Sequence, residues 1–273
     1  MAVSLADISK LRSMTGAGMM DCKNALTEAQ GDFDKAIEII RKKGQAIAAK
    51  RSDREAAEGC VLAADKDGFA ALVGIKCETD FVAKNADFIA LTQKILDAAM
   101  ENKPSSIDEL KNLKIDGRTV ADLITERSGV TGEKMELGAY EFIKGNAVAS
   151  YIHNGNKLAS LVSFTENADR QILHDVAMQV AAMSPISVDR NDVPKDVVAK
   201  ELEIGKEKAR EEGKPEAILD RIAEGRLNKF FQESTLMEQA FIKDAKMSVK
   251  QYLQNASKSL AATGFRRFTL NQE

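Results

Sequence analysis

The sequence has no tryptophan, three cysteines, two histidines and four prolines among its 273 residues. The cysteines, Cys22, Cys60 and Cys77, are odd in number and widely spaced, which argues against a disulfide framework and against a zinc site. No apolar run approaches the roughly 20 residues that a membrane-spanning helix needs, and the N-terminus lacks the pattern of a signal peptide. We therefore expect a cytoplasmic protein that does not bind membranes.

The common sequence signatures of metal, redox, hydrolase and phosphate-binding sites are also absent. His174 lies in an apolar helical pattern, and His153 precedes an Asn-Gly turn signal. Cys22 and Cys77 have no evident neighbouring base, so buried thiols are the simplest interpretation, with a thiol-dependent enzyme as an alternative. The net charge of −3 and the 5% aromatic content disfavour nucleic-acid binding. We expect an interaction protein without cofactor or metal rather than an enzyme.

The N-terminal part of the sequence predicts a small bundle of three helices. Asp7 is expected to cap the first helix, which carries Met14 on its apolar face. A second helix is expected over residues 19–29, and a third begins with Phe33. The alanine-rich residues 45–58 are expected to continue as a helical linker that crosses solvent. Because three short helices enclose little core, such a bundle is typical of a docking module.

An internal duplication organises the rest of the chain. Each copy consists of two strands joined by a turn and followed by a helix. The copies comprise strands 60–64 and 69–77 with helix 86–100, and strands 147–153 and 158–164 with helix 168–183. The tripeptides Ala-Leu-Val and Asn-Ala-Asp of the first copy align with Ser-Leu-Val and Asn-Ala-Asp of the second. This pattern predicts an α+β fold with two related halves, each a small antiparallel sheet covered by helices.

Residues 189–229 interrupt the second half with a highly charged helical segment. About half of these residues are charged, and a Glu-Glu-Gly-Lys-Pro break at 211–215 supplies a helix stop and a restart. We expect an antiparallel, coiled-coil-like hairpin that projects into solvent; two surface helices packed on the core are the alternative. The expected organisation is a helical domain with its linker over 1–54, core subdomains over 55–140 and 141–273, and the hairpin inserted at about 187–229.

The two copies differ in the connection between strand and helix. Fourteen positions separate Leu72 from Ala86 in the first copy, whereas seven separate the equivalent residues of the second. Strand-to-helix connections commonly need about two to six residues, so the first copy has an insertion within residues 77–85. Phe81 could fold back under this connection while Asp80 caps a helical turn. Alternatively, both side chains could be presented to a partner's cleft, with the phenyl ring as a hydrophobic wedge.

Three separated motifs occur in one order along the chain. They are Leu11-Arg12 with residues 15–23 (TGAGMMDCK), residues 79–85 (TDFVAKN), and residues 224–227, 229–230 and 236–239 (EGRL, KF and LMEQ). Together they resemble bacterial elongation factor Ts, the guanine nucleotide exchange factor for elongation factor Tu. The resemblance covers essentially the whole chain and implies a ubiquitin-associated-like N-terminal domain. We expect no counterpart, after Phe268, of the C-terminal helical module found in some members of that family, and hence none of the contacts made by that module.

The resemblance also implies a mechanism and the residues that carry it. The wedge segment, Thr79, Asp80, Phe81 and Val82, would enter elongation factor Tu·GDP near its Mg²⁺ and phosphate-binding elements and promote GDP release. The implied partner is elongation factor Tu, both GDP-bound and nucleotide-free, in a complex that is one-to-one or two-plus-two.

The same resemblance implies further contacts outside the wedge segment. Arg12, Met19 and Met20 would dock on the G domain of the partner, although one methionine could belong to the core, and His153 is an additional contact candidate. A non-exchanging adaptor that binds partners through its N-terminal bundle is the alternative function.

Overall fold

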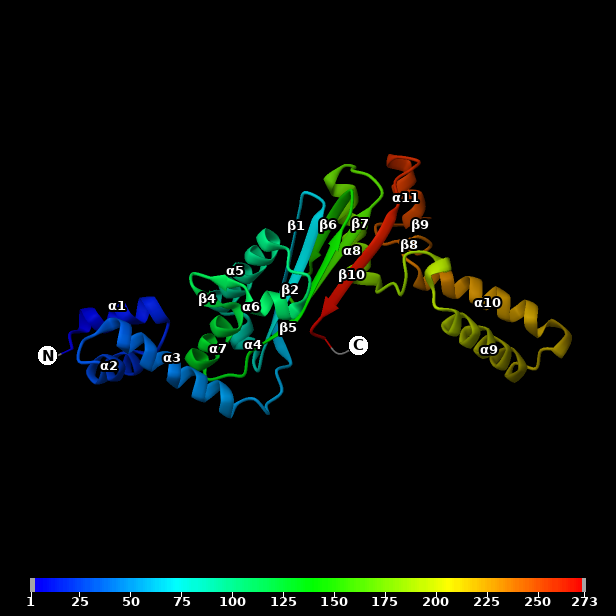
Figure 1. Cartoon of the computed structure of the whole chain (residues 1–273). Coiled ribbons are helices and arrows are strands. Elements are labelled where there is room, and N and C mark those ends of the chain that lie inside the picture. Colours follow the sequence, from blue (N-terminus) through cyan, green and yellow to red (C-terminus); the bar gives the residue numbers. More distant parts are fainter. Residues whose placement is uncertain (1–2, 272–273) are drawn as a thin grey trace. The chain divides into compact units, whose positions relative to one another are not determined.

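The computed structural model describes residues 3–271 and has the mixed helix and sheet composition of the predicted α+β class (Figure 1). The chain divides into two compact units. The first unit comprises the chain up to Leu62, Val73–Tyr140 and a few residues after Phe268, and the second comprises Ala63–Leu72 and Glu141–Phe268. Within residues 3–271, no helix has the length and apolar character needed to cross a membrane.

The first unit begins with three helices, α1 (Leu5–Thr15), α2 (Met19–Glu28) and α3 (Phe33–Lys50). Ser4 caps α1, and Asp7 completes a capping box from the third helical position, so the expectation that Asp7 is the cap was wrong. Ile8 and Leu11 are buried, but Met14 is 53% exposed, which corrects its predicted place on the apolar face. The core of this bundle also includes Cys22, Ala25, Leu26 and Ala36.

The second half of α3 packs against α7 (Val120–Thr131), which corrects the expectation of a helix crossing solvent (Figure 1). Gly44 and Gly129 form the crossing point, and a Cβ added at Gly129 would lie 2.1 Å from the Gly44 Cα. The two backbones approach closely because neither residue has a side chain. Beside the crossing, Arg41 Nε lies 2.8 Å from the Glu126 carboxylate.

Each of the two three-stranded sheets has the second strand of a hairpin at its centre. Their strand orders are β1-β2-β5 and β10-β7-β6. The strands are β1 (Glu58–Lys66), β2 (Phe69–Cys77), β5 (Glu136–Lys144), β6 (Ala147–Ile152), β7 (Leu158–Phe164) and β10 (Ala262–Thr269). β6 and β7 pair antiparallel from Ala147 opposite Phe164 to Ile152 opposite Ala159. Both hairpins, β1–β2 and β6–β7, therefore lie where the internal duplication predicted them.

The helix that follows each hairpin starts differently in the two copies. Asn85 caps α5 (Ala86–Asn102), whereas Asp169 caps α8 (Arg170–Met183). Helix α8 therefore starts two residues later than the alignment of the two Asn-Ala-Asp tripeptides predicts. The remaining short elements of the first unit are α4 (Asp80–Ala83), α6 (Ile107–Asn112), β3 (Lys114–Ile115) and β4 (Arg118–Thr119).

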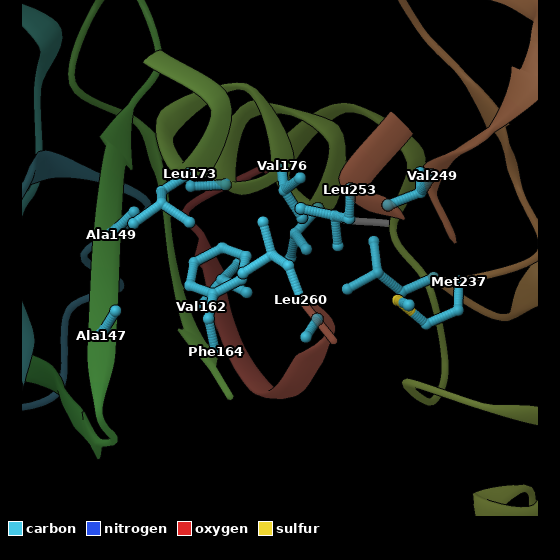
Figure 2. Packing of buried hydrophobic residues seen from close by; sticks show 14 of the residues in the cluster. Ala147, Ala149, Val162, Phe164, Leu173, Val176, Met237, Val249, Leu253 and Leu260 are labelled. Carbon is cyan, nitrogen blue, oxygen red and sulfur yellow. The ribbon is translucent and has the colours of Figure 1, made fainter. Parts of the chain in front are cut away.

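The hydrophobic core of the second unit lies between its sheet and α8 (Figure 2). Val162 and Phe164 from β7 face Leu173 and Val176 from α8. The C-terminal elements close this core with Met237, Val249, Leu253 and Leu260. Val249 and Leu253 belong to α11 (Val249–Ala256), which follows β8 (Ala240–Phe241) and β9 (Asp244–Ser248), whereas Met237 and Leu260 lie in the connections before β8 and after α11.

The charged segment forms a helical hairpin within the second unit. α9 (Lys195–Glu211) and α10 (Leu219–Ser234) pack chiefly against each other (Figure 1). Gly205 allows the close approach, since a Cβ there would lie 3.1 Å from the Ala223 Cα. The chain turns at Gly213, which adopts a positive φ of 74°. Short 3₁₀ turns precede the two helices, at Arg190–Asp192 and Glu216–Ile218.

Candidate partner-binding site

The wedge segment forms a single helical turn directly after β2. Thr79 is the N-cap of α4, and its hydroxyl accepts a hydrogen bond from the Val82 amide at 3.4 Å. Asp80 is therefore the first helical residue rather than the cap. Its carboxylate accepts a hydrogen bond from Lys84 Nζ at 2.7 Å, which raises the pKa of Lys84. The seven-residue insertion thus accommodates one capped turn.

Phe81 points away from the protein on this turn. Its exposed fraction is 84%, whereas Ala83 is buried at 8%. Residues two positions apart lie on nearly opposite faces of a helix, so burying Ala83 leaves Phe81 in solvent. The interpretation in which Phe81 folds back under the connection was therefore wrong. A large apolar side chain held in water on a short, well-defined turn is the feature of this region that packing does not explain.

Two glutamates hold the base of the turn in a reciprocal arrangement. Glu133, in the connection from α7 to β5, accepts hydrogen bonds from the Thr79 hydroxyl at 2.6 Å and from the amides of Thr79 and Glu78 at 3.1 and 3.2 Å. In return, Glu78 accepts a hydrogen bond from the Lys134 amide at 2.7 Å. We call these contacts the glutamate clamp. Glu133 could not be predicted from the sequence, because it lies more than 50 positions from the turn and resembles an ordinary surface glutamate.

Arginines from the segment after α3 contact the same clamp. Arg51 and Arg54 each place a guanidinium nitrogen 3.3 Å from the Glu78 carboxylate. The hydrogen bond from the Lys134 amide, helped by these two cations, holds the pKa of Glu78 below its ordinary value. Glu78 therefore stays ionised and connects the end of the helical bundle to the base of the wedge segment.

The thiols do not have the properties of nucleophiles. Cys22 and Cys77 are both fully buried. Burial raises the pKa of Cys22, and burial together with the charge of Glu133 raises the pKa of Cys77 to about 12. A reactive cysteine needs an accessible thiolate, so this structure argues against the thiol-dependent enzyme. Within residues 3–271, no group of three or more His, Cys, Asp or Glu side chains is arranged to hold a metal ion.

The bundle presents the other predicted contact residues to solvent. Met19 and Met20 open α2 and are 41% and 64% exposed, so neither methionine belongs to the core. Arg12 is exposed on α1. Met14 and Leu5, 53% and 75% exposed, are further large apolar side chains in solvent on the same bundle that the sequence analysis did not select. A helical periodicity alone assigned Met14 to the core, which explains that omission.

His153 lies in the second unit, at the turn between β6 and β7. Its side chain is exposed, and its Nδ1 lies 3.1 Å from the Tyr151 hydroxyl. The rings of Tyr151 and His174 in turn pack edge to face, with 5.5 Å between their centroids. The structure thus brings together the four wedge residues, and it places Arg12, Met19 and Met20 on one helical bundle.

Comparisons with known proteins agree on one family. The family model for elongation factor Ts matches residues 78–272. Curated proteins named elongation factor Ts are similar over the whole chain and over their own full length: one from Porphyromonas gingivalis is 62% identical, one from Azobacteroides pseudotrichonymphae 55%, and one from Bacteroides fragilis 45%. With the full length aligned at these identities, the chain belongs to the elongation factor Ts family of translation elongation factors.

Proposed function

We propose that this protein binds elongation factor Tu·GDP and accelerates the release of GDP, so that GTP can bind. The exposed Phe81 ring would enter a cleft of the partner near its Mg²⁺ and phosphate-binding elements. Asp80 would act beside it by disturbing the surroundings of the Mg²⁺ ion. The observation that carries this proposal is the 84% exposure of Phe81 on a capped and clamped turn.

The geometry of the turn suits insertion into a partner. Moving a phenylalanine side chain from water into an apolar cleft contributes about 1.5–3 kcal/mol. Because the turn is already ordered by the Thr79 cap and the glutamate clamp, little conformational entropy is lost when it binds. To act on the partner's Mg²⁺ site, Asp80 must break its ion pair with Lys84. An exposed ion pair of this kind contributes only about 0–1 kcal/mol, so the cost of breaking it is small.

The wedge cannot provide the whole effect. An acceleration of about 10⁴-fold requires the barrier to fall by roughly 5.5 kcal/mol, which is roughly two to four times what burial of one phenyl ring supplies. Docking through other surfaces must therefore hold the wedge in place. Arg12, Met19 and Met20 are proposed to dock on the G domain, where flexible methionine side chains can adapt to an apolar surface. His153 is proposed as a further contact from the second unit.

Linkage gives the proposal a thermodynamic requirement. A protein that weakens the binding of GDP to its partner must itself be bound more weakly, by the same factor, when GDP is present. The nucleotide-free partner should therefore bind this protein more tightly than the GDP complex does. A titration of both forms by calorimetry would show the difference.

Release of a fluorescent GDP analogue from elongation factor Tu, in excess unlabelled GDP, tests the proposal directly. We expect acceleration that saturates as the concentration of this protein rises. Binding without acceleration would refute exchange and favour an adaptor, for which the exposed Leu5, Met14, Met19 and Met20 would be the docking surface. Light scattering of the complex would distinguish one-to-one from two-plus-two assembly.

A further inference from the structure

The glutamate clamp connects the wedge segment to the C-terminal end of α7 through hydrogen bonds of Glu133. Gly132 ends α7 with a φ of 73°, and the next residue is Glu133. The Glu133 carbonyl accepts a hydrogen bond from the hydroxyl of Ser128, which is itself buried. Main chain and side chain of Glu133 are therefore both fixed: the carbonyl is bound to α7, and the carboxylate is bound to residues 78–79.

The groups that Glu133 binds lie at the start of the exposed turn. One carboxylate oxygen accepts from the Thr79 hydroxyl at 2.6 Å, and the other accepts from the amides of Thr79 and Glu78. Hydrogen bonds from neutral donors to a charged carboxylate are about twice as strong as neutral pairs. Phe81 follows two residues later and makes no packing contact of comparable extent, since it is 84% exposed. Its direction therefore depends on how firmly Thr79 is held.

We propose that Glu133 is a positioning residue for nucleotide exchange. It would not touch the partner's nucleotide; it would fix the direction in which Phe81 enters. This inference rests on the proposed exchange function. A binding group that is held loosely loses effect even when every contact residue is present, so loss of Glu133 should lower the rate of release from the assembled complex rather than the affinity of docking.

Exchange kinetics separate positioning from docking. In Glu133→Ala we expect the maximal rate of GDP release to fall about tenfold, equivalent to about 1.4 kcal/mol, while the half-saturating concentration changes less than about twofold. Glu133→Gln should recover most of the rate, because its amide oxygen can accept from the two backbone amides and its amide nitrogen can donate to the Thr79 hydroxyl. Glu136→Ala is the matched control, since that carboxylate pairs with the ammonium groups of Lys76 and Lys134, at 3.8 and 3.5 Å, rather than with residues 78–79.

A second measurement tests, without any partner, whether the glutamate clamp restricts the motion of the turn. The chain has no tryptophan, so Phe81→Trp introduces a single indole whose time-resolved anisotropy measures motion of the turn. Adding Glu133→Ala to this variant should increase the fast, local component, whereas adding Glu136→Ala should leave it unchanged. Circular dichroism and thermal unfolding show whether each variant is folded.

The outcomes distinguish this inference from the proposed function. An unchanged maximal rate in Glu133→Ala, or an indole no more mobile than in the parent, would overturn the positioning role while exchange itself stands. If the unmodified protein fails to accelerate release, the exchange function fails, and the positioning role fails with it. A fall in rate that glutamine does not rescue in a folded variant would mean that the hydrogen bonds to residues 78–79 do not set the rate, and it would also overturn the proposal.

Discussion

Replacing Gly129 by alanine should drive α3 and α7 apart, whereas the same replacement at Gly44 should not. In a helix interior, alanine is favoured over glycine by about 1 kcal/mol. At Gly44 the new Cβ would lie 3.4 Å from the Gly129 Cα, close to ordinary contact, so Gly44→Ala should raise the free energy of unfolding by up to about 1 kcal/mol.

At Gly129 the new Cβ would lie 2.1 Å from the Gly44 Cα, and the obstacle is backbone that cannot rotate away. Overpacking of this kind commonly costs about 1–3 kcal/mol, and we expect the upper end of that range. The gain in helix propensity offsets part of the cost, and it is smaller than usual because Gly129 lies near the end of α7. The net loss in the free energy of unfolding should be about 2 kcal/mol.

Differential scanning calorimetry and amide hydrogen exchange would check this pair. A difference of about 3 kcal/mol between the variants corresponds to melting temperatures at least about 6 °C apart. If the helices separate without unfolding the unit, the amides of the second half of α3 should lose protection in Gly129→Ala alone. Equal melting temperatures together with equal protection in the two variants would refute the argument from the glycine crossing.

Three further predictions concern single side chains. Phe81→Ala should leave the melting temperature unchanged, because the ring is exposed, yet slow nucleotide exchange about tenfold to a hundredfold, or roughly 1.4–2.7 kcal/mol; an unchanged rate in stopped-flow release would contradict it. Asp175 is buried, and although burial works against its charge, hydrogen bonds from Lys243, Gln171 and Tyr252 hold its pKa below the usual value. Asp175→Ala should therefore cost about 2–4 kcal/mol in urea unfolding at neutral pH, and this difference should shrink as the pH falls below about 4, through the lowered pKa of the folded state. Cys77, with its pKa raised to about 12, should resist iodoacetamide at pH 8 in the native protein and react in urea, as intact mass would show.

The parts of the fold that could be predicted from the sequence depend on local patterns. The duplicated hairpins, the charged helical hairpin and its break near Gly213 depend on turn residues and periodicity that are close together in the chain. The starts of helices were less predictable, because several polar residues compete for the cap. Ser4 rather than Asp7 caps α1, and α8 begins at Arg170 after the Asp169 cap, two residues later than the predicted start at 168.

The sequence motif of the candidate site could be recognised, but the arrangement of its side chains could not be predicted. An insertion with Phe81 could be recognised from the spacing of the two copies, yet composition could not decide whether the ring is buried. That outcome depends on Ala83 taking the inner face of the turn. The roles of Glu133 and of the Gly44–Gly129 crossing arise from tertiary contacts between distant segments, and no local pattern distinguishes these residues from an ordinary glutamate or from glycines in weak helices.

The strand order of the second sheet has a consequence for synthesis on the ribosome. β10 is an edge strand that pairs with the central β7, but about 100 residues separate the end of β7 from the start of β10. At about 5–20 residues per second, one edge of β7 stays open for roughly 5–20 s while α8, the helical hairpin and α11 are made. An open strand edge can pair with another chain. The arrival of Ala262–Thr269 therefore sets the moment at which the central strand β7 is no longer open to pairing with another chain.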